Sequence, residues 1–132
     1  MSYEESLRSI SLNADASVGI YTGVPGQPGS AVPNGGKQYC FLRITGKDQC
    51  GLAVGGGGEI VVGVLQNKPQ KPGAAATVGI AGVTNVVSGG ALAAGVRVGP
   101  DATGRAVAAA GGPCVTLGTA AGAGELVPAL FI

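Results

Sequence analysis

Residue types that usually carry chemistry are scarce in this sequence. It contains no histidine, so the commonest general base and the commonest metal ligand are both missing. Cys40, Cys50 and Cys114 are odd in number and lack CxxC spacing, which argues against a zinc knuckle and a closed disulfide framework. Cys40 and Cys114 stand inside apolar runs, where a thiol without an activating base is a small buried hydrophobe. The sequence predicts structural cysteines.

Seven carboxylates are the remaining candidates for acid–base chemistry, and they are scattered along the chain. A glycoside hydrolase needs two carboxyl groups facing one cleft, about 5–9.5 Å apart. No spacing in the sequence brings two of the single carboxylates together. A hydrolase built on Glu59 and Asp101 is therefore a minor hypothesis, to be tested by replacing both with alanine.

Several glycine-rich stretches invite a phosphate-binding interpretation, and each fails on spacing. Gly36-Lys37 lacks both the earlier glycine and the following Ser or Thr of a Walker loop. The runs that begin at Gly55 and Gly122 lack the third glycine of a dinucleotide fingerprint. Ser88 lacks the glycine two positions before it that a nucleophile elbow requires. We expect no catalytic residue, cofactor or metal, and hence no enzyme.

Turn residues divide the chain every eight to twelve residues, the spacing of an all-β sandwich or barrel. Glycine (26) and proline (8) make up about a quarter of the 132 residues and fall mainly at these breaks. Short β-branched runs lie between them, and period-two alternation assigns their faces. Strands are predicted at residues 9–13, 17–22, 38–44, 52–54, 59–65, 75–81, 83–87, 96–98, 105–108, 114–118 and 125–130. The expected fold is all-β, a small single-domain β-barrel or sandwich.

Three segments receive more specific predictions. Residues 23–37 hold five glycines and three prolines, so they should form a long exposed loop, either a binding element or simply a mobile one. The glycine run 55–58 predicts a hairpin turn. Residues 59–65 are almost continuously apolar, which predicts a strand covered on one side by the core and on the other by a second sheet or a neighbouring subunit.

The charge content restricts the kinds of partner that are expected. Only 11% of the residues are charged and the net charge is +1, with the basic residues scattered. Nucleic acid and acidic membranes need clustered Lys and Arg, so neither is expected as a partner. A soluble domain usually has about 25% charged residues, so the scarcity favours a subunit that hides surface against other chains. No signal peptide or spanning segment is recognisable, which predicts synthesis in a cytoplasm.

The second half of the chain contains a series of turns flanked by apolar residues. In order they are GVLQNKP at 63–69, ATVGIAGV at 76–83, VVSGGALAAGV at 86–96, DATGRA at 101–106, and the stretch from Gly118 to Val127. Their order and spacing resemble the capsid decoration, or head cement, proteins of tailed bacteriophages. The resemblance covers slightly over half of the chain, and the first 58 residues match less well.

This resemblance implies a structural virion protein without catalytic residues or cofactors, made in the host cytoplasm. Such proteins bind the outer surface of the expanded head, commonly as trimers at three-fold and quasi-three-fold positions. They clamp subunits of the major capsid protein against the pressure of packaged DNA. In such proteins the N-terminal segment often orders only on the capsid, where it can add a strand to a sheet edge.

Carried over to this sequence, the resemblance divides the chain into a flexible N-terminal arm with the first strand, residues 1–16, and a β-rich decoration domain, residues 17–132. The arm that docks on the capsid would be residues 2–13. The capsid-binding residues would be Ser2, Tyr3, Glu4, Glu5, Ser6, Leu7, Arg8, Ile10 and Leu12. A different class stays open: a trimeric phage fibre, spike or surface adhesion module whose loop 23–37 binds a glycan or a receptor.

Overall fold

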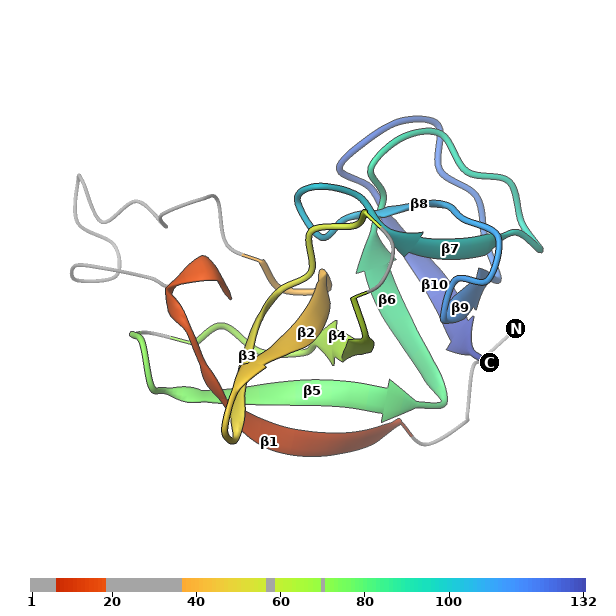
Figure 1. Cartoon of the computed structure of the whole chain (residues 1–132). Coiled ribbons are helices and arrows are strands. Elements are labelled where there is room, and N and C mark those ends of the chain that lie inside the picture. Colours follow the sequence, from red (N-terminus) through yellow and green to blue (C-terminus); the bar gives the residue numbers. More distant parts are fainter. Residues whose placement is uncertain (1–6, 19–36, 57–58, 70) are drawn as a thin grey trace, which may run out of the picture.

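Strands make up almost all of the regular structure (Figure 1). The computed structural model describes residues 7–18, 37–56, 59–69 and 71–132. Those residues contain a single turn of 3-10 helix, η1 (Ala16–Val18), and ten strands. The strands are β1 (Arg8–Ala14), β2 (Phe41–Gly46), β3 (Gln49–Leu52), β4 (Val61–Leu65), β5 (Ala75–Ala81), β6 (Val83–Val87), β7 (Arg97–Pro100), β8 (Ala106–Ala108), β9 (Cys114–Thr116) and β10 (Leu126–Phe131). The expected fold class, a small all-β domain containing a barrel, is confirmed.

The first five strands form a closed barrel in the order β1-β3-β2-β4-β5. The other five form a second sheet in the order β6-β10-β9-β7-β8. Figure 1 shows the barrel on the left and the second sheet on the right, with β5 running into β6 through a sharp corner. Gly82 stands at this corner with a φ of 93°, a backbone conformation that glycine adopts without steric cost.

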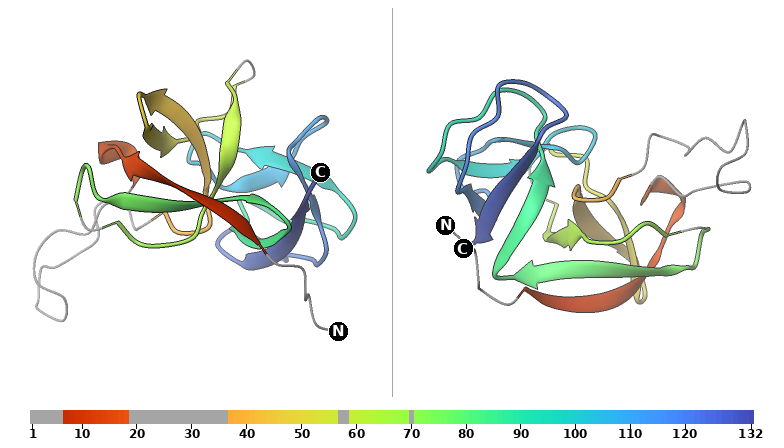
Figure 2. Two further views of the ribbon diagram at one scale, coloured as in Figure 1. Left: turned by 90° about the horizontal axis from the view of Figure 1, so that it is seen from below. Right: turned by 180° about the vertical axis from the view of Figure 1, so that it is seen from behind.

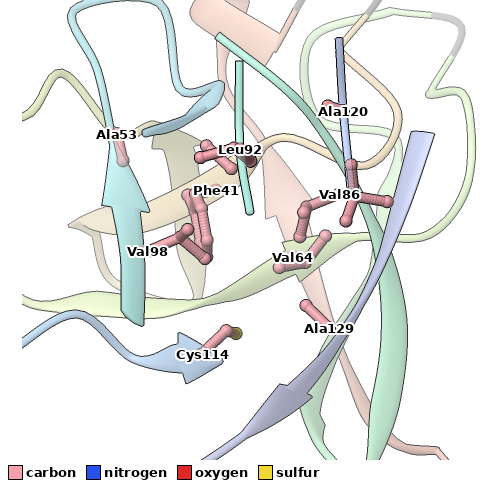
Figure 3. Close-up of a cluster of buried hydrophobic side chains, with 11 residues drawn as sticks. Phe41, Ala53, Val64, Val86, Leu92, Val98, Cys114, Ala120 and Ala129 are labelled. Atoms are coloured by element: carbon pink, nitrogen blue, oxygen red, sulfur yellow. The ribbon is translucent and has the colours of Figure 1, made fainter. Parts of the chain in front are cut away.

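Two clusters of buried side chains hold these layers together. The barrel cluster fills the barrel and comprises Ala14, Val18, Leu42, Cys50, Leu65, Ala76 and Val78. The intersheet cluster lies between the barrel and the second sheet (Figure 3) and comprises Phe41, Ala53, Val64, Val86, Leu92, Val98, Ala106, Cys114, Ala120, Val127 and Ala129. Aliphatic residues and alanine dominate both, with Phe41 the one aromatic member.

Strands β2 and β4 contribute to both clusters. Phe41 and Leu42 are adjacent on β2 and fully buried, the first in the intersheet cluster and the second in the barrel cluster. Val64 and Leu65 on β4 divide in the same way. Period-two alternation sends neighbouring side chains to opposite faces, so both faces of these strands are buried. The predicted two-sided cover is confirmed for β4, residues 61–65, by the barrel core and the second sheet, whereas Ile60 in the same stretch is 81% exposed.

Several expectations about strands and turns are wrong, among them the strand predicted at 52–54, which lies earlier in the chain as β3 (Gln49–Leu52). The strand predicted at 17–22 is η1 at Ser17 and Val18, because Asp15 Oδ1 accepts hydrogen bonds from the Ser17 backbone N–H and hydroxyl and bends the chain. The remainder of that strand, and residues 23–36 of the predicted loop, lie outside the described residues. The glycine run at 55–58 does not make a hairpin, because β3 and β4 flank β2 and do not pair with each other. The hairpin in this region joins β2 to β3.

Candidate functional site

The described part of the predicted N-terminal arm lies in the barrel. Residues 2–6 lie outside the described residues, but β1 begins at Arg8 and pairs with β5 from Arg8–Ala81 through Asn13–Ala75. The strand predicted at 9–13 is therefore confirmed, whereas the expectation that residues 8–13 order only on a partner is wrong. Leu7 is half-buried over β5, since a β-carbon at Gly79 would lie 3.1 Å from Leu7 Cδ1.

Alternate backbone groups of β1 point in opposite directions. The Ala14 N–H donates to Ala74 O at 2.9 Å, on the β5 side. The Asn13 N–H donates to Asp48 O at 2.8 Å, and the Asp15 N–H to Cys50 O at 2.9 Å, both on the β3 side. By the same alternation, the backbone N–H and C=O groups of Ser9 and Ser11 also face the β3 side.

The β3 side of β1 is only partly paired. The register between β1 and β3 consists of Asn13–Gln49 and Ala14–Cys50, so within the described chain no strand pairs with residues 8–12 on that side. Ser9 and Ser11 are also exposed. We call this segment, residues 8–12 on the β3 side, the open edge of β1. Unpaired backbone groups along an exposed edge are a template for adding a strand from another chain.

Exposed isoleucines surround the end of the barrel where β1 begins. Ile10 is opposite the buried Val78 and 40% exposed, and Ile80, two residues further along β5, is 36% exposed. Ile44 is opposite the buried Cys50 and 52% exposed. Strands β2 and β5 run in the same direction, because each is antiparallel to β4, so Ile44 and Ile80 lie toward the same end. We call Ile10, Ile44 and Ile80 the barrel mouth.

The predicted site residues thus have different surroundings. Arg8 and Ile10 are exposed on β1, while Leu12 is partly buried against the barrel cluster. Ile44 and Ile80 were not predicted as site residues, since alternation places them on the inward face. Only the barrel geometry shows that this face runs out into solvent at its end. The sequence contained one signal for them, because each is a β-branched residue that lies two residues beyond a buried residue on the same face.

Glu59 holds the connection between β3 and β4. Its Oε1 accepts hydrogen bonds from the Val54 N–H at 3.1 Å and the Gly55 N–H at 2.6 Å, and its Oε2 lies 3.1 Å from the same Val54 nitrogen. Arg43 Nε is 4.0 Å from Oε2, too far for a hydrogen bond. The Glu59 carboxylate therefore accepts hydrogen bonds from backbone N–H groups just after the end of β3 and stabilises this connection.

Asp101 organises the turn before β8 in a similar way. Its Oδ1 accepts hydrogen bonds from the Thr103 N–H and hydroxyl, both at 2.8 Å, and from the Arg105 N–H at 3.0 Å. Partial burial raises the pKa of this carboxyl, but these hydrogen bonds and the Arg105 charge outweigh it and leave the pKa below its usual range. A carboxyl with a lowered pKa is ionised near neutral pH, so it is a poor general acid.

The thiols and the remaining candidate nucleophile are buried. Burial raises the pKa of Cys40 and Cys50 to about 11 and that of Cys114 to about 12, so the thiolate form is rare at neutral pH. The Ser88 hydroxyl donates to Gly122 O at 2.6 Å and accepts from the Glu125 N–H at 3.0 Å. These groups connect parts of the fold.

Described residues line two open depressions, of about 340 and 330 Å³. Glu59 and glycine, alanine and proline residues of the 55–56 and 109–113 segments line much of the larger one. Asp15, whose Oδ2 accepts a hydrogen bond from the Thr45 hydroxyl, lies at the smaller one. In the described part of the chain, no three His, Cys, Asp or Glu residues are grouped to hold a metal ion. No helix there is long and apolar enough to cross a membrane.

Comparison with models of known protein families finds no match for this chain, and comparison with curated protein sequences finds none.

Proposed function

We propose that this chain is a structural virion protein that binds the outer surface of an expanded bacteriophage head and stabilises it against internal DNA pressure. The proposal includes a homotrimer at three-fold and quasi-three-fold positions, with the major capsid protein as partner and no enzymatic activity. It begins from the resemblance of residues 59–132 to head decoration proteins. The observation that carries it is the open edge of β1, which lies beside the barrel mouth.

The open edge and the barrel mouth supply complementary parts of a docking site. The backbone groups of Ser9 and Ser11 offer hydrogen bonds to a strand of the capsid protein, and Ile10 and Ile80 offer apolar surface next to it. Residues 2–7 immediately precede this strand and extend the proposed contact. Each copy then needs only a modest patch, because a trimer that touches several capsid subunits gains affinity through effective concentration.

A single backbone donor provides the test. Replacing Ser11 by proline removes an N–H on the open edge while leaving the β5 side of β1 paired, and proline is tolerated on edge strands. We expect Ser11→Pro to lower cosedimentation with expanded heads at least about tenfold, the equivalent of roughly 1.4 kcal/mol. Ser11→Ala keeps the N–H and should bind as the wild type does. The wild type should bind expanded heads and not unexpanded proheads.

Two further variants keep the test decisive if Ser11→Pro folds poorly. Ile80→Lys places a charge in the barrel mouth and should weaken head binding, whereas Val54→Lys is a matched control. Val54 is 45% exposed and follows β3 at the opposite end of the barrel. Equal head binding by Ile80→Lys, Ser11→Pro and wild type would refute the proposed site. A wild type that binds no expanded head but binds a glycan would favour the adhesion module instead.

A further inference from the structure

The outward face of the second sheet is unusually apolar. On β6 and β10 the inward residues are Thr84 and Val86, and Val127 and Ala129, all buried. The residues that alternate with them point away from the core. Together with Val115 on β9, these outward residues are Val83, Asn85, Val87, Leu126, Pro128 and Leu130, and we call the seven the outer face.

Strand register brings the outer face together. Leu130 is opposite Val83 on β6 and opposite Val115 on β9, so these three side chains form one row across three adjacent strands. Leu126 is opposite Val87 and is 54% exposed, although it is a leucine at the beginning of a strand in the middle of the sheet. Figure 2 (right) shows β6 and β10 side by side in this sheet. Asn85 is the one polar member of the face.

The barrel of the same molecule shows the ordinary pattern. On β1 the residues that alternate with the inward ones are Ser9, Ser11 and Asn13, all polar and exposed. A sheet with one face in water normally alternates apolar-in with polar-out. The chain follows this rule on β1 and breaks it on β6 and β10, so the outer face has the character of a covered surface.

The distribution of charge favours a second copy of this chain as the partner of the outer face. Of the fifteen charged side chains, residues 83–132 contain only four, and none of these is a lysine. Two of the four stand at opposite corners of the outer face. Arg97 on β7 is level with Val115 and Leu130, and Glu125 comes directly before Leu126 at the other end of β10. When copies pack through this face around a three-fold axis, Arg97 at one corner of a copy can pair with Glu125 at the opposite corner of its neighbour.

We infer that the outer face is the surface through which copies of this chain associate. The inference rests on the proposed function only in taking the chain to work as an oligomer. The contact brings the apolar outer faces of neighbouring copies together, with an Arg97–Glu125 pair at the rim of each contact. It leaves the open edge of β1 and the barrel mouth, which belong to other strands, for a different partner.

Sedimentation velocity over a wide concentration range tests this surface. The wild type should sediment as an oligomer, and Leu126→Lys should weaken association about a hundredfold or more, because the ammonium would be buried without a partner. Asn85→Lys, a change at an exposed position, should do the same and leaves the core untouched. Val54→Lys is the matched control and should sediment as the wild type does. Circular dichroism verifies that each variant is folded.

A charge exchange tests the rim pair, with circular dichroism as the control for folding, because Arg97 also donates two hydrogen bonds to Gly112 O and Glu125 Oε2 accepts one from the Gly122 N–H. Arg97→Glu should weaken association, and Arg97→Glu combined with Glu125→Arg should restore it. A wild type that is monomeric at every concentration, or an oligomer indifferent to Leu126→Lys and Asn85→Lys, would overturn the inference. So would a Leu126→Lys protein that stays oligomeric but no longer binds heads, because the face would then belong to the capsid protein. An oligomer that Leu126→Lys disrupts supports the inference even if no head is bound, which would refute only the proposed function.

Discussion

Replacing Phe41 by alanine should destabilise the whole molecule, because β2 is shared between its two clusters. The Phe41 ring is completely buried between the barrel and the second sheet, and Leu42, the next residue, is completely buried inside the barrel. Truncating a buried phenylalanine costs about 3–5 kcal/mol from lost burial and the cavity left behind. A domain is stable by only about 5–15 kcal/mol, so this single change removes a large part of the total.

Urea unfolding followed by far-UV circular dichroism measures the loss, and native-state hydrogen exchange locates it. Side chains of β1 contact only the barrel cluster, and side chains of β10 contact the intersheet cluster. The backbone amides of both strands should nevertheless lose equal protection against hydrogen exchange. Leu42→Ala should give the same joint loss at about 2–5 kcal/mol. Ile60→Ala is the control, since Ile60 is 81% exposed and its truncation should stay within about 0.5 kcal/mol.

The pattern of protection decides whether the reasoning is right. If Phe41→Ala lowers protection in β10 while β1 keeps its wild-type values, the barrel and the second sheet unfold independently. The idea of one cooperative unit joined through β2 and β4 would then be refuted. A loss well under 2 kcal/mol, with an unchanged urea dependence, would show instead that the neighbouring side chains collapse into the cavity.

Three further predictions concern single groups. Gly63→Ala should cost at least about 2 kcal/mol, because the new β-carbon would collide with the Gly79 carbonyl oxygen, whereas Gly90→Ala meets open space and should be nearly neutral in the same urea titration. The pKa of Asp101 is lower in the folded protein than in the unfolded chain, where it is near 4, so the ionised carboxyl stabilises the fold at neutral pH. This stability is lost as the pH falls from the unfolded-state pKa through the lower folded value. Thermal unfolding between pH 7 and pH 3 should therefore depend less on pH in Asp101→Asn than in the wild type, and an equal pH dependence would contradict this. The three thiols should resist alkylation at pH 8 in the folded protein and react fully in urea, because burial raises their pKa to about 11–12; rapid labelling of the native protein would contradict their burial.

Strand positions follow from the sequence where turn residues and alternation agree. Strands β5 and β6 have the predicted limits, residues 75–81 and 83–87, with Gly82 alone between them. Local chemistry suffices there, since β-branched runs prefer extended backbone and the glycine takes the positive φ. The same logic fails at 17–22, where Asp15 and Ser17 offer the backbone a competing set of local hydrogen bonds.

Strand pairing could not be obtained from the same local signals. A glycine run joins strands equally well by a hairpin or by a crossing connection, and the choice depends on which edge of β2 is free. Once β3 pairs with one edge of β2, the returning chain must take the other edge, and Glu59 fastens the resulting connection through the Val54 and Gly55 N–H groups. Glu59, which the sequence offered as a candidate catalytic carboxylate, instead stabilises the connection between β3 and β4.

The two proposed surfaces also depend on strand pairing, which is why the sequence alone does not reveal them. Alternation in the sequence shows that Ile10 and Ile80 share a face with buried residues, but only the register between β1 and β3 shows where that face and the β1 edge become free. On β10 both sets of alternating residues are apolar, so the pattern alone cannot distinguish the core face from the outer face. A strand that is apolar on both faces inside a monomer must lie between two layers, as β4 does. Among the described residues, strand β10 has a layer on one side only, and the second copy that we propose would supply the other.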